Sequence, residues 1–175
     1  MDIKLLVMDV DGTLTDGKIY MSANGELMKA FNIKDGYAIA RLKEYGIEPA
    51  IITGRVSEIV KQRCSELKIT ELYQGIENKL FKLKDVCTKK GLSLSQVAYI
   101  GDDVNDLPCI QQCGVTACPA DAVEKVKKAV NMVTEAKGGE GAVREFCEYL
   151  VENCIPKRDE ELTDFEFSEI KFEDQ

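Results

Sequence analysis

Short apolar runs alternate with longer amphipathic stretches along most of the chain. The apolar runs predict buried strands over residues 3–8, 50–52, 72–73, 97–100, 115–117 and 132–133. Apolar residues at helical spacing predict helices over 36–45, 57–67, 79–90, 105–113, from 121 onward and over 142–151. This alternation predicts an α/β fold in which a parallel sheet carries helices on both faces.

One segment departs from this alternation. Residues 18–21 and 26–31 are typical of two short strands around the turn Ser22-Ala23-Asn24-Gly25, so we predict an antiparallel hairpin there. In parallel α/β sheets the ligand lies beyond the carboxyl ends of the strands, which makes polar residues at those ends the candidates for function. These candidates are Asp9, Asp11, Thr53, Lys79, Asp102 and Asp103.

The composition is that of a soluble globular protein. The 175 residues fit one domain, and the longest apolar runs are too short for a membrane-spanning helix. The chain has no histidine, which excludes Ser-His and Cys-His catalytic pairs, His-ligated zinc and imidazole bases. Its seven cysteines show no Cys-x-x-Cys spacing, and no signal-peptide pattern opens the sequence. We therefore expect buried thiols in a reducing cytoplasm.

Negative charge is concentrated at one end of the sequence. The formal charge is −8, and residues 157–175 account for −5 of it through eight acidic and three basic side chains. Without a basic face, nucleic-acid binding is not expected. We predict a globular domain over 1–156 and an acidic tail over 157–175. Because the tail contains Phe165, Phe167 and Phe172, it either docks across a subunit interface or is a flexible segment with incidental aromatics.

The segment Asp9-Val10-Asp11-Gly12-Thr13 is the central chemical signal. Two carboxylates separated by one residue at the end of a buried strand require a positive partner. Mg²⁺ fits, since it prefers hard oxygen ligands. A calcium loop would continue with further oxygen ligands and a terminal Glu, whereas Leu14 follows here. We therefore predict a Mg²⁺ site at this strand end.

Four motifs occur in an order that resembles the haloacid dehalogenase superfamily. They are Asp9 to Thr13, Thr53 after a strand, Lys79, and Gly101-Asp102-Asp103-Val104-Asn105-Asp106. Longer matches at 9–17, 31–37, 51–55, 73–79, 98–106 and 138–145 resemble the family of 3-deoxy-D-manno-octulosonate (KDO) 8-phosphate phosphatases. The resemblance covers residues 3–152. It implies a Rossmann-like fold and a cytoplasmic, Mg²⁺-dependent phosphatase acting on KDO 8-phosphate in lipopolysaccharide biosynthesis.

The resemblance also implies the catalytic roles. Asp9 would attack the phosphoryl group and form an aspartyl phosphate. Asp11 would protonate the departing sugar oxygen and later take a proton from the attacking water. Thr53 and Lys79 would hold the phosphoryl oxygens. Taken alone, Thr53 could instead be a helix N-cap, and Lys79 a surface lysine.

The metal ligands follow from the same resemblance. Mg²⁺ would bind the Asp9 carboxylate, the Asp11 backbone carbonyl and Asp102. Asp103 and Asp106 are expected nearby, where they would orient metal-bound water or Lys79.

For the sugar acid, the resemblance implies two further groups of residues besides Asp11 and Lys79. Arg55 and Arg63 match positions that bind the acidic sugar, and a guanidinium suits a carboxylate through paired hydrogen bonds. The substrate loop corresponds to Asn32, Ile33, Lys34, Asp35 and Gly36. One position departs from the family, because many relatives carry a basic residue where this chain has Ala40. Arg63 could also be a solvated helix residue.

The spacing of the motifs leaves no room for a cap domain. Only 41 residues separate Asp11 from Thr53, and 25 separate Thr53 from Lys79. An independent domain needs about 50 residues or more. Another element must cover the site, and the resemblance implies a homotetramer in which neighbouring subunits do so, with the hairpin at the interface.

Three other functions compete with this one. The substrate could be a nine-carbon sugar acid 9-phosphate, of KDN or sialic acid, although some relatives with that activity carry an acidic residue in place of Arg55. A phosphoacceptor module of the response-regulator type also combines carboxylates, a hydroxyl and a lysine around Mg²⁺, but its acceptor follows a later strand. The third is an inactive partner domain of a sugar nucleotidyltransferase.

Overall fold

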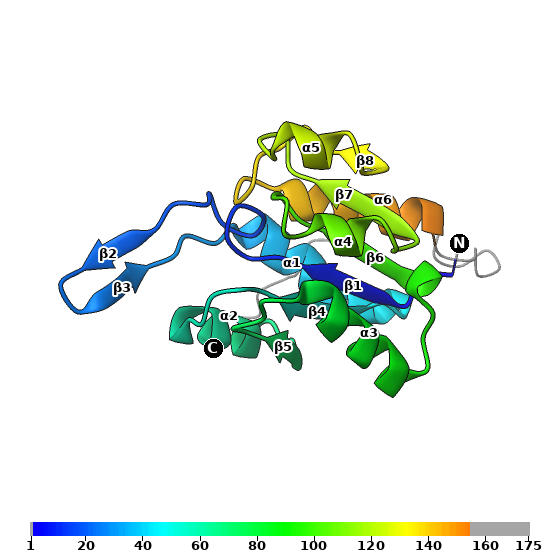
Figure 1. Ribbon diagram of the computed structural model, residues 1–175, viewed down its shortest axis with the longest axis horizontal. Helices are drawn as coiled ribbons and strands as arrows, with labels where there is room; N and C mark the ends of the chain where they lie inside the picture. The colour runs from blue at the N-terminus through cyan, green and yellow to red at the C-terminus, as the bar shows by residue number, and fades with distance from the viewer. Residues whose placement is uncertain (1, 155–175) are drawn as a thin grey trace, which may run out of the picture.

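The computed structural model describes residues 2–154, and its strands form two sheets. The main sheet is parallel throughout and has the order β5-β4-β1-β6-β7-β8 (Figure 1). Its strands are β1 Leu5–Met8, β4 Glu48–Ile52, β5 Glu71–Tyr73, β6 Val97–Ile100, β7 Val115–Cys118 and β8 Met132–Val133. The predicted hairpin consists of β2 Tyr20–Ser22 and β3 Gly25–Met28 and extends away from the body (Figure 1). The acidic tail and its phenylalanines lie outside the described residues.

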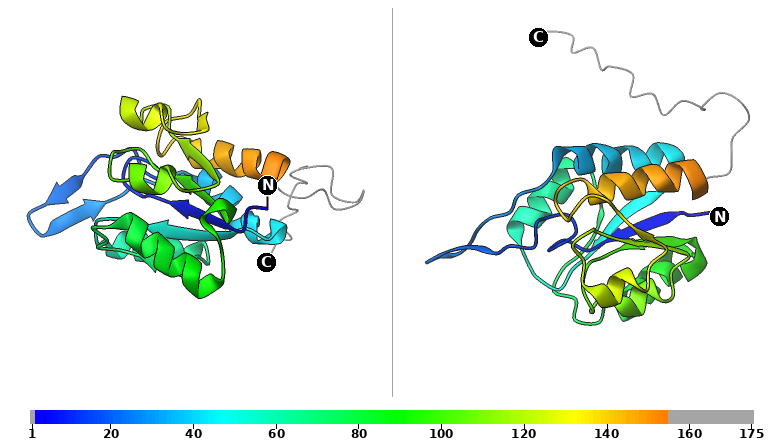
Figure 2. Two further views of the ribbon diagram at one scale, coloured as in Figure 1. Left: turned by 45° about the vertical axis from the view of Figure 1, so that its right-hand side comes forward. Right: turned by 90° about the horizontal axis from the view of Figure 1, so that it is seen from above.

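Helices cover both faces of the sheet, which confirms the predicted layers (Figure 2). One face carries α1 Ile33–Arg41, α2 Glu58–Glu66 and α6 Ala142–Cys154, and the other carries α3 Lys79–Lys90, α4 Leu107–Ile110 and α5 Glu124–Lys127. Successive residues of β1 alternate between the two layers, so that Leu6 and Met8 pack in the first core and Leu5 and Val7 in the second. Burial on both faces explains why this strand is continuously apolar.

The first helix begins earlier than predicted. It starts at Ile33 rather than at residue 36, because the Asn32 side chain accepts a hydrogen bond of 2.8 Å from the Lys34 backbone N–H and caps the helix. Its continuation, Leu42–Tyr45, is a 3₁₀ turn that ends at Gly46 with φ 74°, at the glycine that the sequence indicates as a stop. A second 3₁₀ turn, Leu94–Gln96, leads into β6.

The helices predicted over 105–113 and from 121 are present but begin later, and the first is shorter than predicted. Each is a single turn, α4 and α5. Before α4 the chain makes a turn in which the Asp106 carboxylate accepts the backbone N–H groups of Asp102 and Asp103, at 3.1 and 3.3 Å. Side-chain hydrogen bonds of this kind compete with helix formation, so the helix starts only at Leu107.

Three further expectations from the sequence concern membrane-spanning helices, the cysteines and a cap domain. Within residues 2–154 no helix is long and apolar enough to cross a membrane. All seven cysteines are free thiols, and six are buried, as predicted. The motif spacing is filled by the hairpin, α1 and α2, and the described residues contain no separate cap domain.

Candidate active site

Asp9 and Lys79 form a buried ion pair at the carboxyl end of the sheet. Asp9 follows β1, and its backbone N–H donates to the Ile100 carbonyl of the neighbouring strand at 3.0 Å. Lys79 is the first residue of α3, a helix capped by the Asn78 side chain. The Lys79 Nζ lies 2.8 Å from Asp9 Oδ1. At 3 % exposure Lys79 is not a surface lysine, so that alternative is wrong.

Asp106 holds the other side of this lysine. Its Oδ1 lies 2.8 Å from Lys79 Nζ and accepts a 2.7 Å hydrogen bond from the Tyr99 hydroxyl. Its Oδ2 accepts the two backbone N–H groups of the turn described above. Four donors therefore fix the Asp106 carboxylate in its position beside Lys79. A Cβ at Gly101 would lie 2.3 Å from the Asp106 Cγ, so only glycine fits there.

Three carboxylates meet at this point and can offer oxygen ligands to a metal ion. One oxygen each from Asp9, Asp102 and Asp106 lies within 4.8 Å of the others. Since four donors already occupy Asp106, the oxygens of Asp9 and Asp102 have the free acceptor positions that a cation needs. Asp102 Oδ1 accepts from the Thr13 hydroxyl at 3.2 Å. The donor set is all oxygen, which suits Mg²⁺.

The electrostatics of this cluster favour a cation. Burial raises the pKa of Asp9 to about 6, with Asp106 adding to the rise and Lys79 opposing it. Burial, followed by the charges of Asp9 and Asp106, raises the pKa of Asp102 to about 7. For Lys79, burial alone would lower the pKa, but Asp9 and Asp106 outweigh it and hold the pKa raised. The cluster has more negative charge than Lys79 neutralises, and a divalent cation would remove the excess.

The backbone next to the cluster is shaped by a glycine. Gly12 has φ +93°, and a Cβ there would lie 2.1 Å from Asp102 Oδ2. Any other residue would be strained and would push Asp102 out of place. The glycine of the Asp-x-Asp-Gly-Thr motif therefore lets the turn after β1 approach Asp102 closely.

Asp11 lies at the edge of the cluster, with its side chain 21 % exposed. Its Oδ1 forms an ion pair with Lys29, and its Oδ2 lies 3.7 Å from Arg55 Nε. Lys29 and Arg55 also reach Glu26, at 3.1 and 3.6 Å. Neither Lys29 nor Glu26 could be singled out from the sequence, because both lie in a hairpin whose apolar and turn residues dominate the pattern. The signal available in the sequence was that these two oppositely charged residues are three positions apart.

Thr53 directly follows β4 and lies at 3 % exposure near the same edge. Its backbone N–H donates to the Tyr73 carbonyl at 3.0 Å, which ties it to β5. The N-cap of α2 is Ser57, whose hydroxyl accepts the Val60 N–H at 3.3 Å. The alternative in which Thr53 caps this helix is therefore wrong.

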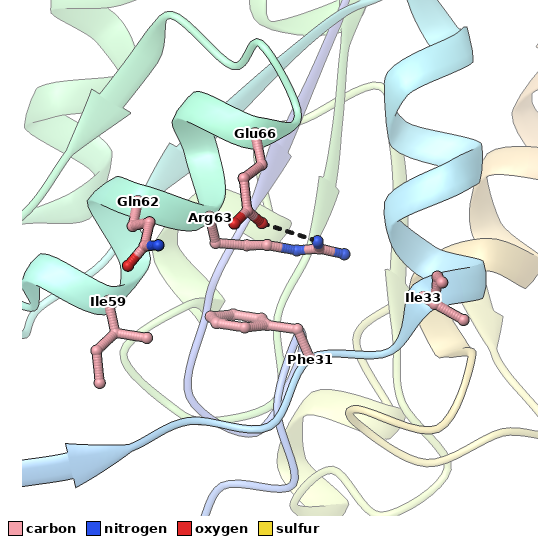
Figure 3. A pocket seen from close by; sticks show the side chains of 6 residues that line it. All are labelled: Phe31, Ile33, Ile59, Gln62, Arg63 and Glu66. Carbon is pink, nitrogen blue, oxygen red and sulfur yellow. Dashed lines mark hydrogen bonds and ion pairs between the residues drawn. The ribbon is translucent and has the colours of Figure 1, made fainter. Parts of the chain in front are cut away.

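Arg63 projects from α2 into a hollow of about 360 Å³ that Asp9, Asp11 and Asp102 do not line (Figure 3). Its guanidinium lies 5.8 Å from the centroid of the Phe31 ring and pairs with Glu66 at 3.2 Å. A Cβ at Gly36 would lie 2.3 Å from its Nη2. Arg63 thus packs between α1 and α2, and its role toward a substrate stays a prediction.

The residues of the predicted substrate loop point in different directions. Asn32 caps α1 and donates to the Gly139 carbonyl at 3.3 Å. Ile33 and Lys34 are exposed. Asp35 is 1 % exposed, and its Oδ1 accepts the Arg144 backbone N–H of α6 at 2.8 Å. Burial raises the pKa of Asp35 to about 6.

Three other positions, Ala40, Arg41 and Asp103, lie away from the carboxylate cluster or at its exposed edge. Ala40, where the family resemblance leads to the expectation of a basic residue, is exposed on α1. Arg41 does not replace that residue, since its guanidinium binds the Tyr37 hydroxyl at 3.1 Å and Glu44 at 2.9 Å. Asp103 is exposed and its carboxylate accepts the Val104 N–H at 2.7 Å, so its backbone, through Asp106, is its link to the cluster.

Known proteins are similar to this chain in sequence. A family model described as haloacid dehalogenase-like hydrolase matches residues 65–146. The 3-deoxy-D-manno-octulosonate 8-phosphate phosphatase of Escherichia coli strain K12 is 47% identical over 150 residues, which cover 86% of this chain and 80% of the relative.

Solved structures agree with this similarity. The Moraxella catarrhalis 3-deoxy-D-manno-octulosonate 8-phosphate phosphatase, in complex with magnesium ion, phosphate ion and KDO, superposes with a TM-score of 0.84 at 42% identity, over 86% of this chain and 87% of that one. The cobalt-bound Haemophilus influenzae phosphatase gives a TM-score of 0.83 at 39% identity, over 86% and 88%. The chain therefore belongs to the 3-deoxy-D-manno-octulosonate 8-phosphate phosphatase family of haloacid dehalogenase-like hydrolases.

Proposed function

We propose that this protein is a Mg²⁺-dependent phosphatase that hydrolyses KDO 8-phosphate to KDO and phosphate. The observation that carries the proposal is the buried Asp9–Lys79–Asp106 chain with Asp102 beside it. It supplies a nucleophile, a cation for the phosphoryl oxygens and a metal position on one sheet edge. The Moraxella relative holds magnesium, phosphate and KDO, which supports the same ligands here.

Asp9 attacks phosphorus, and the bond to the sugar oxygen breaks as the aspartyl phosphate forms. Asp11 gives its proton to that oxygen, and the resulting carboxylate then takes a proton from the water that hydrolyses the aspartyl phosphate. Lys79 and Thr53 hold the phosphoryl oxygens while negative charge redistributes during transfer. Mg²⁺, held by Asp9, the Asp11 carbonyl and Asp102, supplies charge neutralisation when bound. Asp106 keeps Lys79 in position.

The sugar end of the substrate is assigned to Arg55. Its side chain is 43% exposed at the mouth of the site, and its two contacts with carboxylates are long, at 3.6 and 3.7 Å. It is therefore free to turn toward a substrate carboxylate. A nine-carbon sugar acid 9-phosphate has the same carboxylate and is the second candidate. Parallel assays on both sugar phosphates separate the two.

The uncapped site leads us to propose a homotetramer in the cytoplasm. The hairpin exposes apolar side chains along both strands, with Met21 and Leu27 at 61% and 60% exposure. An apolar surface of this kind on an extended element is typical of a protein interface. Sedimentation of the full chain tests this state, and a monomer at micromolar concentration would refute it.

The test of the function is a phosphate-release assay on a panel of sugar phosphates with Mg²⁺. We expect KDO 8-phosphate to be turned over many times per chain, which a phosphoacceptor module does not do. Asp9→Asn removes the nucleophile and is expected to lower kcat by about a thousandfold or more. Full activity of Asp9→Asn would show that the mechanism is wrong. Undiminished turnover in excess chelator would refute the metal requirement.

A further inference from the structure

Lys29 is a buried cation that the mechanism above leaves without a function. It follows β3, at the point where the hairpin returns to the body, and its side chain is 2% exposed. The ammonium lies between two carboxylates, the Asp11 Oδ1 and the Glu26 Oε1, the latter at 3.1 Å. A buried charge is stable only when paired, so this lysine and these two carboxylates depend on one another.

Arg55 touches the same two carboxylates but is held differently. Its Nε lies 3.7 Å from Asp11 Oδ2, and its Nη2 lies 3.6 Å from Glu26. These separations exceed a hydrogen bond. Because the Arg55 side chain is 43% exposed and that of Lys29 only 2%, Arg55 can leave Asp11 at little cost, whereas Lys29 cannot. Lys29 is the permanent partner of Asp11, and Arg55 is the exchangeable one.

Glu26 anchors Lys29 to the body of the protein. The Ser57 hydroxyl donates to the Glu26 carboxylate, and the Ser57 backbone N–H donates to Gln74 Oε1 at 2.8 Å. Ser57 is also the N-cap of α2. Burial would raise the pKa of Glu26, but the hydrogen bonds from Ser57 and Lys29 outweigh it and lower the pKa. The position of Lys29 is thus set by α2 as well as by the hairpin.

We propose that Lys29 is a positioning residue that holds the Asp11 carboxyl group in the orientation needed for proton transfer to the leaving oxygen. The proposal rests on the role assigned to Asp11 under the proposed function. Lys29 binds Oδ1, so that Oδ2 is the oxygen that carries and delivers the proton once Arg55 turns to the substrate. The base of the hairpin then helps to position the proton donor, because it carries Lys29 and Glu26.

The proposal is tested by comparing substrates whose leaving groups differ in whether they must be protonated. Loss of a general acid slows release of a sugar alkoxide, which must be protonated, far more than release of p-nitrophenolate, which leaves as an anion. We compare kcat/KM for glucose 6-phosphate and p-nitrophenyl phosphate, neither of which has a carboxylate for Arg55. Lys29→Met is expected to lower the value for glucose 6-phosphate about 10- to 100-fold and that for p-nitrophenyl phosphate less than about threefold.

Lys18→Met is the matched control, because Lys18 enters the hairpin, is 73% exposed and pairs only with Asp16 among the described ion pairs. It is expected to leave both values unchanged. Lys29→Arg keeps a cation next to Asp11 and is expected to recover most of the selective loss. If Lys29→Met does not fold, Lys29→Gln, which keeps a donor without the charge, is measured instead and is expected to show the same selectivity.

Equal losses on both substrates, or no loss on either, would overturn the proposal. The first would make Lys29 a residue for folding or phosphate binding, and the second would make it dispensable. The leaving-group ratio does not depend on the natural substrate. If wild-type protein fails to hydrolyse KDO 8-phosphate yet Lys29→Met shows the selective loss, the proposed function is wrong and the role of Lys29 stands.

Discussion

The phosphate end and the sugar end of the site are built in opposite ways. At the phosphate end, Asp9, Lys79 and Asp106 are at most 5% exposed, and hydrogen bonds and ion pairs of 2.7 to 3.3 Å join them to β6 and its following turn. At the sugar end, Arg55 is 43% exposed with contacts of 3.6 Å or longer. The difference teaches that the ends of β1 and β6 and the start of α3 hold the proposed phosphoryl-transfer groups tightly, whereas the residue proposed to select the sugar is exposed and loosely held.

Lys29 and Asp11 lie between these two regions. Their contact joins the strand end to the hairpin, across 18 positions in the sequence. A substitution at the phosphate end should therefore affect every substrate, and one at the sugar end should affect only substrates with the matching group. The predictions below test that division.

Lys79→Met is expected to have the largest effect. Removing the cation that pairs with Asp9 and Asp106, and that is proposed to hold the phosphoryl oxygens, should lower kcat about a thousandfold on every phosphate monoester. Lys82→Met is the matched control on the same helix, since Lys82 pairs with Asp85 at 3.3 Å, away from the cluster. Steady-state assays on KDO 8-phosphate and p-nitrophenyl phosphate measure both. A substrate-selective loss for Lys79→Met would break the proposed division.

Arg55→Ala is expected to act on one class of substrate. If its guanidinium pairs with the substrate carboxylate, kcat/KM for KDO 8-phosphate should fall about 10- to 100-fold, and that for p-nitrophenyl phosphate less than about threefold. Arg63→Ala is measured beside it on the same two substrates. Arg63 is the second arginine predicted to bind the sugar, but its guanidinium packs against Phe31 and pairs with Glu66. Equal losses on both substrates would assign Arg55 to phosphate binding or to folding.

Tyr99→Phe tests how tightly the phosphate end is held from inside the core. The change removes one of four donors to Asp106 and leaves the ring, which is 0% exposed, in place. We expect kcat to fall about 5- to 20-fold on all substrates, as Lys79 loses part of its alignment. Tyr73→Phe, which removes a hydroxyl bound to Glu71, is the control and should change kcat little. Unchanged kcat in Tyr99→Phe would show that the remaining donors suffice.

The smallest expected effect is a pH-dependent shift in thermal stability. The pKa values of Asp9 and Asp102 are raised to about 6 and 7 in the metal-free protein, so folding favours their protonated forms. Their contribution to stability is present below the unfolded pKa, near 4, and is lost as the pH rises through 6 and 7. Metal-free protein should therefore be less stable at pH 8 than at pH 5.5.

Mg²⁺ should reverse this trend, because it binds the deprotonated carboxylates. At saturating metal we expect Tm to rise by about 5–10 °C at pH 8 and by much less at pH 5.5. Differential scanning fluorimetry with and without Mg²⁺ measures both shifts, and Asp102→Asn should remove most of the rise at pH 8. Equal shifts at the two pH values would show that these carboxylates are not the titrating ligands.

The sequence was sufficient for the layers of the fold and for the placement of the residues that form the proposed phosphate end. Strands buried on both faces are continuously apolar, and helices show their period, so the alternation could be recognised without coordinates. Parallel strands end at a common edge, so Asp9, Thr53 and Asp102 could be placed together from their positions after strands. Helix boundaries were less accurate, since the caps and turns that set them depend on single hydrogen bonds such as that of Asn32.

Only the tertiary structure decided which side chains meet across long sequence separations. Nothing in the local pattern distinguishes Lys29 from the exposed Lys18, yet one is buried against Asp11 and the other is in solvent. Tyr99 is one apolar position of a buried strand in the sequence, and its hydroxyl becomes a donor to Asp106 only because α4 follows on that face. Periodicity determines the face that a residue occupies, whereas the partner on that face depends on how the whole chain packs.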